Sequence, residues 1–378
     1  MSGEYGILFG VLGLYIILGI IINFSFENKA ARLFQSLSMI VILGGLSAAR
    51  AVSVGADTQL YNNLYSWDFE AGNWQNILSS KYPLYSLYTY CLHFISSNPQ
   101  IIIVMNSLII VTSVAITIYS YSENVFLSNI LYVTLYFFFN SMNISRQFLA
   151  IGILLVATVY LNKNKIWLFW ILYIGACLVH STALVGIVFF VIHVIHWNKT
   201  RFILSGALGI ALLIFYKRIL NLFIVLFPAY SMYSIGTSDT NVETLSSQSN
   251  GGTLLVTIFY LLFICIATLC KVRFQDENRE KRFAFLTVVM IIAVMFGIVF
   301  YKNILMTRVI SYLSIFSIVY IPEVIDLFIL NIDTTSVNRW YIRFLVVCGV
   351  IAITCVPLYV QLNKNLSDVI PYVSFVAR

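Results

Sequence analysis

The amino-acid sequence predicts an all-α, polytopic membrane protein. Hydrophobic residues make up 60% of the 378-residue chain and charged residues only 10%, whereas soluble domains carry about 25% charged residues. The mean hydropathy is +0.92, and the 24 tyrosines, 29 phenylalanines and 6 tryptophans suit the aromatic belts of a membrane interface. These values exclude a soluble protein, and they predict a single integral membrane domain over residues 1–378.

About 12 apolar runs approach the length of about 20 residues that a transmembrane helix needs. In chain order they are 5–24, 33–49, 101–119, 125–142, 147–161, 166–179, 181–197, 202–227, 253–270, 283–301, 309–329 and 341–361. The first run lacks a basic leader and a small-residue cleavage site, so we expect it to be retained as a span. A further run, 82–95, is shorter, rich in tyrosine and contains Pro83, which predicts a re-entrant or interfacial helix.

The basic connectors between these runs predict the orientation of the chain. They are 27–32, 162–165, 198–201, 271–282 and 331–339, and the positive-inside rule places them in the cytoplasm. The number of predicted spans between consecutive connectors is even, as this placement requires, if the run 82–95 does not cross the membrane. The opposite face then receives extracytoplasmic loops at about 50–81 and 228–252, together with the breaks at 143–146, 179–181 and 302–308. Because the positive charge lies in short connectors, it reports orientation and does not indicate nucleic-acid binding.

The arginines that interrupt or border apolar runs fall on this outer face together with an aspartate and a histidine, although all of them come from distant parts of the sequence. An arginine in hydrocarbon costs several kcal/mol and therefore usually faces a wet or functional cavity. These residues are Arg50, Asp57, Arg146, His180 and Arg308. We therefore predict one extracytoplasmic site assembled from separate spans.

Arg146 and Arg308 are the predicted anion-binding residues. Arg146 lies between Asn143 and Gln147 at the mouth of a span, and a guanidinium can grip phosphate oxygens with two parallel hydrogen bonds. The alternative for Arg146 is an arginine that snorkels from a helix end. Arg308 opens the run 309–329 with Tyr312 one helical turn later, and as an outward cation it departs from the positive-inside trend.

Asp57 and His180 are competing candidates for a general base. Asp57 lies in GADTQLY, followed one turn later by Tyr61, and a carboxylate beside aromatic rings suits activation of a sugar hydroxyl. The alternatives are a solvated carboxylate or an ion pair with Arg50. His180 lies in LVHSTALVG at the outer end of two short runs, where an imidazole can donate to a phosphate or accept from a hydroxyl. Its alternative role is structural.

Several signatures are absent from the sequence, and we expect neither a metal nor a nucleotide cofactor. The sequence contains no GxxxxGK[ST] phosphate-binding loop, no HExxH zinc-binding motif, no GxSxG nucleophile elbow and no DxD motif. All six cysteines lie inside apolar runs without metal-ligand spacing: Cys91, Cys177, Cys265, Cys270, Cys348 and Cys355. Lys217 and Arg218, within the run 202–227, indicate either a broken helix of the transporter kind or snorkelling side chains.

Four motifs in order resemble the EpsG family of Wzy-like polysaccharide polymerases. They are GADTQLY after Arg50, NISRQFLAIG, LVHSTALVG and TRVISYL, and the resemblance runs from Arg50 to Tyr312. It implies a GT-C-like fold in a bacterial plasma membrane, with the active site on the extracytoplasmic side. It also implies joining of oligosaccharide units carried on undecaprenyl diphosphate, with a flippase and a chain-length regulator as functional neighbours.

The chemistry of that reaction assigns roles to the candidate residues. Arg146 and Arg308, with Arg50 as a further substrate-binding cation, would stabilise the leaving diphosphate. Asp57 or His180 would accept the proton of the attacking hydroxyl. The remaining candidates would orient sugar or phosphate: Tyr61, Asn143, Gln147 and Tyr312. The competing functions are a flippase or transporter of lipid-linked sugars, a polysaccharide ligase or single-sugar transferase, and a membrane scaffold, which would leave the arginines unexplained.

Overall fold

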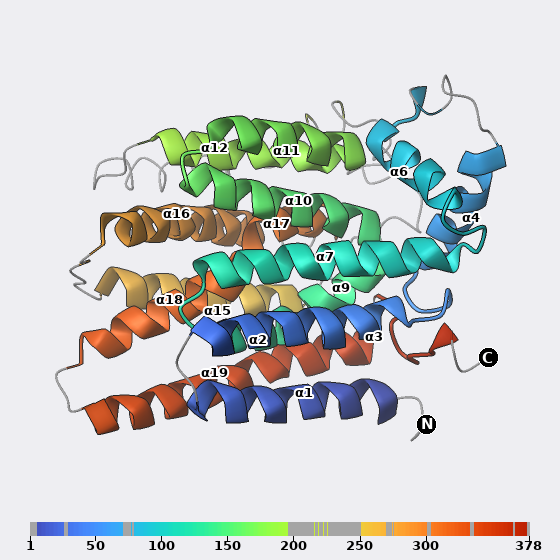
Figure 1. The fold of residues 1–378 in the computed structure, drawn as a ribbon. Coiled ribbons are helices and arrows are strands. Elements are labelled where there is room, and N and C mark those ends of the chain that lie inside the picture. The colour runs from blue at the N-terminus through green and yellow to red at the C-terminus, as the bar shows by residue number, and fades with distance from the viewer. Residues whose placement is uncertain are drawn as a thin grey trace. The chain divides into compact units, whose positions relative to one another are not determined.

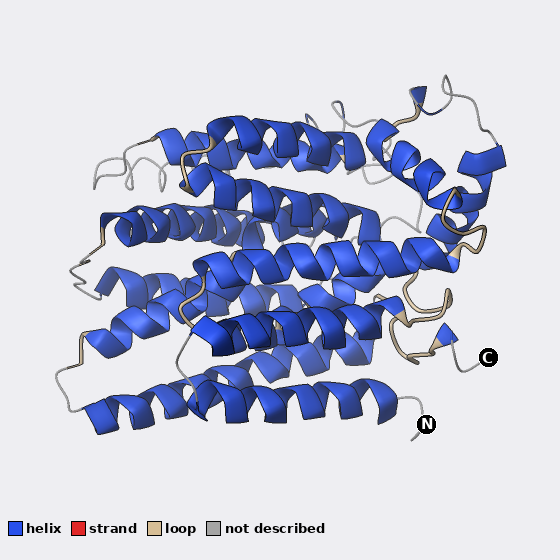
Figure 2. Ribbon diagram, viewed as in Figure 1, coloured by secondary structure: helices blue, strands red, loops and turns tan. Residues whose placement is uncertain are grey.

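The computed structural model describes residues 6–25, 29–70, 77, 79–195, 215, 218, 222, 225, 251–269, 274, 276–300, 304–332, 336–365 and 367–375. Within these residues the chain is helical and carries no strand beyond an isolated bridge between Arg50 and Ser374 (Figure 2). The all-α prediction is therefore confirmed for the described part of the chain. Most of the predicted run 202–227, with Lys217, and the predicted loop 228–252 lie outside the described residues, while Arg218 is helical and exposed.

The chain divides into two compact units, which are described separately. The first comprises Met1–Ile187 and Tyr341–Arg378. Its elements (Figure 1) are α1 (Gly6–Ser25), α2 (Lys29–Met39), a π-helix (Ile40–Gly44), α3 (Gly45–Ala48), α4 (Thr58–Glu70), α6 (Pro83–His93), α7 (Gln100–Tyr121), α8 (Val125–Thr134), α9 (Phe137–Asn143), α10 (Ser145–Asn162), α11 (Ile166–Val179), a 3-10 helix (Ser181–Gly186) and α19 (Ser336–Lys364) from Tyr341 onward.

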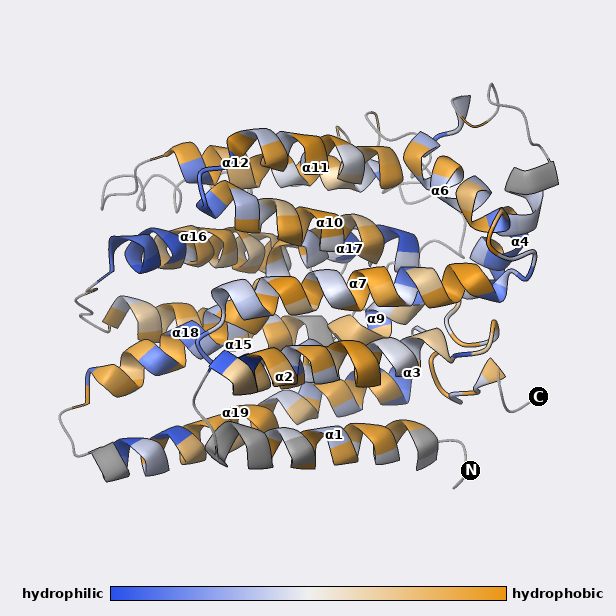
Figure 3. Ribbon diagram, in the orientation of Figure 1, coloured by the Kyte–Doolittle hydropathy of each residue, from blue (hydrophilic) through white to orange (hydrophobic). Residues whose placement is uncertain are grey.

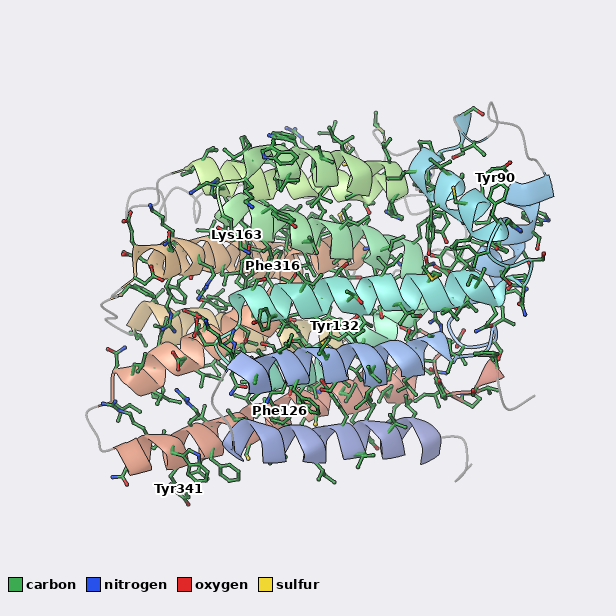
Figure 4. All side chains as sticks on the ribbon, in the orientation of Figure 1. Tyr90, Phe126, Tyr132, Lys163, Phe316 and Tyr341 are labelled. Atoms are coloured by element: carbon green, nitrogen blue, oxygen red, sulfur yellow. The ribbon has the colours of Figure 1, made fainter. Side chains whose placement is uncertain are left out.

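Besides the start of α19 and the single helical residues 215, 218, 222 and 225, the second unit, Val188–Trp340, contains five helices in its described residues. They are α12 (Ile187–Val194), α15 (Gly251–Leu269), α16 (Glu277–Phe300), α17 (Ile304–Ser314) and α18 (Ser317–Leu330). Helix α16 packs against α15, α17 and α18. The ring of Phe189 on α12 contacts those of Phe285 on α16 and Phe316 (labelled in Figure 4), so aromatic packing joins these helices.

Five described helices are long and apolar enough to cross a membrane, and the number rises to seven if each of two bent pairs is one span. The five are Lys29–Ala48, Gln100–Tyr121, Ser145–Asn162, Glu277–Phe300 and Asn338–Lys364. The bent pairs replace the predicted straight runs 125–142 and 309–329, with angles of 54° between α8 and α9 and 42° between α17 and α18. The polytopic membrane class is therefore supported, while the count of about 12 spans and the GT-C-like fold stay predictions.

Local sequence explains where several helices begin. Asn124 caps α8, because its Oδ1 accepts a hydrogen bond from the Leu127 amide at 2.9 Å. Pro83 occupies the first position of α6, where a missing amide hydrogen costs nothing. Helix α6 matches the short helix predicted at 82–95, whereas the predicted outer loop at 50–81 contains a helix, α4, that the sequence pattern did not indicate.

The first unit is packed around α7 and the bent pair α8–α9. Helix α7 contacts α2, α3 and α10, and Gly152 of α10 lets the two backbones approach, because a Cβ there would lie 3.0 Å from the Ser113 Cβ. Every residue of α8 is buried. Phe126 and Tyr132 on α8 (Figure 4) and Phe138 on α9 are among the largest fully buried side chains. This packing fixes the end of α9, from which the candidate site is built.

Polar residues gather at the ends of the helices (Figure 3). Because the helices of the first unit alternate in direction, the end of α3, the end of α9 and the beginning of α10 come together. Lys163 (labelled in Figure 4) caps the other end of α10. The residues of the first unit that were predicted for the outer face therefore share one end of it, and a predicted cytoplasmic connector lies at the other.

Candidate functional site

Arg146 lies in the first turn of α10 among three tyrosine rings, which we call the tyrosine cage (Tyr61, Tyr82 and Tyr85). Its Cζ is 4.2 Å from the ring centroid of Tyr82, 5.4 Å from that of Tyr85 and 5.7 Å from that of Tyr61. Within the described residues no acceptor meets its buried Nε, and no carboxylate pairs with the guanidinium. Ring faces stabilise a cation without using its N–H groups, so these donors stay available to an anion.

His180 and Lys81 also contact Tyr82. The imidazole of His180 stacks on the Tyr82 ring with centroids 5.5 Å apart and planes 11° apart, and its Nδ1 lies 2.7 Å from the Thr182 hydroxyl. The Lys81 ammonium lies 5.3 Å from the centroid of the same ring. Tyr82 therefore brings the predicted residues Arg146 and His180 together and adds a second cation, Lys81, next to them.

Asp57 lies on a turn that α9 holds in place. Its backbone amide donates to Asn143 Oδ1 at 2.9 Å, and its carbonyl accepts from the amide of Tyr61 at 3.2 Å. The side chain is partly exposed, whereas that of Asn143 is buried. Since Asn143 ends α9 and Tyr61 belongs to the tyrosine cage, the Asp57 turn adjoins the surroundings of Arg146.

Gly55 shapes this turn. Its φ is +96°, a left-handed conformation that side chains disfavour. A Cβ at this position would lie 2.6 Å from Thr58 Oγ1 and 2.8 Å from the carbonyl oxygen of Met142. The sequence GADTQLY therefore begins with a glycine because the turn passes directly against the end of α9.

Arg50 is 1% exposed and bonds to the protein's own atoms. Its Nη1 donates to the Ser47 carbonyl oxygen at 2.6 Å, to Ser47 Oγ at 2.9 Å and to Ser107 Oγ at 2.7 Å, while its Nη2 donates to the Met142 carbonyl oxygen at 3.1 Å. Burial lowers the pKa of Arg50 to about 10, so it stays charged at neutral pH. The alternative ion pair with Asp57 is not formed among the described residues.

The remaining predicted residues occupy different places. Gln147 is buried at the beginning of α10. Arg308 and Tyr312 lie one turn apart on α17 in the second unit, where Tyr312 is buried and Arg308 is partly exposed. Their membership of the same site as Arg146 stays a prediction from the sequence.

Sequence reasoning missed Tyr82, Tyr85 and Lys81, because it treated their helix as interfacial packing. The signal was the density of tyrosine in KYPLYSLYTY, directly after a lysine. What it could not supply was the contact between α6 and the first turn of α10. No cluster of three or more His, Cys, Asp or Glu residues with metal-binding geometry occurs in the part of the chain that the structure describes.

Comparison with known protein families identifies the family to which this chain belongs. A model of the EpsG family matches residues 33–374, nearly the whole chain. The chain belongs to the EpsG family. EpsG proteins are Wzy-like polysaccharide polymerases, and the matched range contains both the tyrosine cage and the Asp57 turn. No curated protein and no solved structure matches this EpsG chain.

The family membership confirms the resemblance carried by the four motifs. The EpsG match extends beyond the last of them, through α18 and α19 to residue 374. It therefore includes the segment after α19 that bridges to Arg50. In this EpsG protein the motifs GADTQLY, NISRQFLAIG and LVHSTALVG supply Asp57, Arg146 and His180, all from the first unit.

Proposed function

We propose that this EpsG protein polymerises lipid-linked oligosaccharide units by transferring the growing glycan from undecaprenyl diphosphate onto the incoming unit. The observation that carries the proposal is the state of Arg146. A guanidinium held by three rings, with a buried and unbonded Nε and no carboxylate partner in the described residues, is prepared for an anion of the substrate. In the reaction proposed for this family, the leaving group is a diphosphate, which is such an anion.

The proposed reaction is a glycosyl transfer. A hydroxyl of the incoming unit attacks the anomeric carbon of the growing glycan, so that a new C–O bond forms while the C–O bond to the diphosphate breaks. The hydroxyl proton passes to the base, and undecaprenyl diphosphate leaves with the bonding electron pair. Negative charge therefore develops on the diphosphate, where a fixed cation lowers the barrier most.

We assign the leaving group to the Arg146 side of the site and the base to Asp57. His180 and Lys81 share the Tyr82 ring with Arg146, so a donor imidazole and an ammonium would lie beside the phosphates. Asp57 has no cation partner among the described residues and lies on a turn next to Tyr61. A carboxylate next to an aromatic ring can receive a sugar and take its hydroxyl proton. His180 is thereby proposed as a phosphate contact.

Arg50 takes a different role in this proposal from the direct substrate contact predicted from the sequence. With its Nη atoms bonded to Ser47, Ser107 and Met142, it supports the ends of α3 and α9. We further propose that the transfer takes place at the extracytoplasmic face, because the basic connector 162–165 follows α10 at the end opposite Arg146 and the positive-inside rule assigns it to the cytoplasm. Arg308 is proposed as a second phosphate contact on the strength of its motif.

Polymerisation by purified protein tests the proposal. The protein in nanodiscs receives the lipid-linked unit alone, with a chelator and no nucleotide, and products are resolved by length. We expect a ladder that Arg146→Ala abolishes and Arg308→Ala weakens, whereas Lys163→Ala, at the other end of α10, preserves it. A normal ladder from Arg146→Ala would refute the site. Movement of the lipid across vesicles without any ladder would support a flippase.

A further inference from the structure

The chain segment after α19 crosses back over the turn that carries Asp57. Ala51 N donates to the Val373 carbonyl oxygen at 2.8 Å, and Phe375 N donates to that of Ala49 at 2.9 Å, which forms the bridge around Arg50. Further on, the Gly55 amide donates to the Asp368 carbonyl oxygen at 2.8 Å and the Ala56 amide to that of Ser367 at 3.3 Å. We call residues 367–375 the strap.

The strap is itself anchored on both sides. Tyr372 donates from its hydroxyl to the Leu46 carbonyl oxygen at 2.6 Å, and Ser367 Oγ donates to Asn140 Oδ1 on α9 at 3.0 Å. Val369 is fully buried and Tyr372 is 5% exposed. The strap is therefore packed into the first unit, and its contacts with the Asp57 turn are backbone hydrogen bonds made from a fixed position.

Asn365 gives the strap its shape. It lies directly after α19 with φ +45°, and its Oδ1 accepts hydrogen bonds from the amides of Val369 and Ile370, both at 3.1 Å. Its Nδ2 donates to the carbonyl oxygen of Ile370. A single side chain thus closes the loop that presents the carbonyl oxygens of Ser367 and Asp368 to the turn.

Three hydrogen bonds from other segments hold three consecutive peptide groups of the turn. The strap accepts from Gly55 and Ala56, and Asn143 accepts from Asp57, so three amides in sequence are all bonded to other segments. The third of these amides belongs to Asp57, the residue whose side chain carries the carboxylate. Without the strap, the Asn143 bond and the bond from Thr58 Oγ1 to the Met142 carbonyl oxygen at 3.3 Å would still hold the turn to α9, but the amides of Gly55 and Ala56 would lose their partners and the carboxylate would move with this backbone.

We propose that the strap is a positioning element of the active site, with Asn365 and Tyr372 as positioning residues that act through Asp57. The inference rests on the proposed function, in which Asp57 accepts the proton of the attacking hydroxyl. Misplacement of a reacting group by about 1 Å costs a rate on the order of 100-fold. A loosened strap therefore lowers the rate of bond formation and leaves binding of the lipid diphosphate, on the Arg146 side, unchanged.

The test uses Asn365→Gly in the full-length protein. Glycine accepts the left-handed φ and removes only the side-chain bonds, whereas Asn365→Asp keeps an acceptor oxygen at the same position and serves as the rescue variant. We expect Asn365→Gly to lower kcat about 10- to 100-fold with KM for the lipid-linked unit unchanged, and Asn365→Asp to recover part of the rate, because it keeps the acceptor for the amides of Val369 and Ile370 but loses the donor to the Ile370 carbonyl oxygen. Tyr372→Phe keeps the ring, loses one hydrogen bond and gives a smaller decrease.

Hydrogen exchange provides a readout that does not depend on activity. In Asn365→Gly the peptide covering residues 51–60 should exchange faster, while a peptide from α7 stays protected and reports an intact fold. Faster exchange at 51–60 with an unchanged kcat would overturn the positioning role, as would a lower kcat without faster exchange. If the wild-type protein forms no polymer, the proposed function fails, and unchanged exchange at 51–60 would then refute the strap separately.

Discussion

At the scale of single residues, Tyr82 connects more of the candidate groups than any sequence motif indicated. Its ring contacts Arg146, His180 and Lys81. Two cations near one ring repel each other, and the electron-rich face offsets that repulsion by about 0.5–2 kcal/mol for each cation. We therefore expect the aromatic face of Tyr82, and not its hydroxyl, to be the property on which the proposed site depends.

This gives a prediction for two substitutions at Tyr82. Tyr82→Leu should lower the polymerisation rate about 10- to 100-fold, because Arg146 loses the ring that orients it. Tyr82→Phe keeps the ring and should stay within about threefold of the wild type, since Phe offers a similar face. Initial rates with the lipid-linked unit measure both. Equal losses in the two variants would show that the hydroxyl matters and the ring does not.

Arg50 and Arg32 make a matched pair, because both donate to backbone carbonyl oxygens but differ in burial. Arg50→Lys should destabilise the protein by about 1–3 kcal/mol, since an ammonium cannot reach Ser47, Ser107 and Met142 together. Arg32→Lys should cost less, because Arg32 bonds to the Tyr119 and Ser122 carbonyl oxygens nearer the surface. Thermal unfolding in detergent measures both, and a larger loss for Arg32→Lys would contradict this ranking.

At the scale of elements, the Asp57 turn depends on one glycine. Gly55→Ala forces a Cβ to 2.8 Å from the Met142 carbonyl oxygen and strains a φ of +96°. We expect loss of polymer and faster exchange at residues 51–60, while Gly45→Ala, whose Cβ would meet nothing within 4 Å, should be neutral. A Gly55→Ala protein with normal rate and exchange would show that α9 can move away from the turn.

In the second unit, α16 and α18 are joined by ion pairs. Glu323 is fully buried and its Oε1 lies 2.7 Å from Arg279 Nε, and Asp326 Oδ2 lies 2.7 Å from Arg279 Nη2. Glu323→Gln removes one of the two carboxylates that pair with Arg279, while Asp326 keeps the other, so it should destabilise the protein by about 1.5–3 kcal/mol. The exposed pair Glu277–Lys281 is the control, since Lys281→Gln should cost about 0.5 kcal/mol or less. Thermal unfolding that ranks the two equally would contradict this.

At the scale of the whole molecule, the proposed orientation can be tested with cysteines. Cys91 is exposed on α6 near the tyrosine cage, and Lys163 caps the opposite end of α10. A membrane-impermeant maleimide added to intact cells should modify Cys91 and spare Lys163→Cys, with modified peptides identified by mass spectrometry. In inverted vesicles the preference should reverse. Modification of residue 163 from outside would invert the proposed topology.

The sequence predicted a helix accurately where polar residues lie at both ends of an apolar run. The run 166–179 coincides with α11, because Lys165 and His180 end the apolar stretch on both sides. It did not predict the bend between α8 and α9, where Tyr136 adopts a φ of +70° without a glycine or proline to mark it. Such a bend is set by packing between helices and leaves no local signal.

The charged residues of the candidate site could be predicted from the sequence, but the segments that hold them in place could not. Arg146, Asp57 and His180 were marked by the cost of ionisable groups beside lipid, and the structure places all three at one end of the first unit. The tyrosine cage and the strap were missed, because both depend on contacts between segments far apart in the sequence. Residues 365–375 have no helical or strand periodicity, so no local sequence pattern indicated their contact with the Asp57 turn.

The strap also determines when during synthesis the site is complete. The Asp57 turn is made early, yet the carbonyl oxygens that hold it belong to Ser367 and Asp368, more than three hundred positions later. Chains fold from the N-terminus as they emerge, so the described helices from α1 to α18 precede the strap into the membrane. On the proposed function, we expect a nascent chain that has not yet formed residues 367–375 to hold Arg146 among its tyrosines and to bind lipid diphosphate, while its rate of sugar transfer is lower. The site is then completed by the strap, which follows α19 in the chain, and not by insertion of α19 itself.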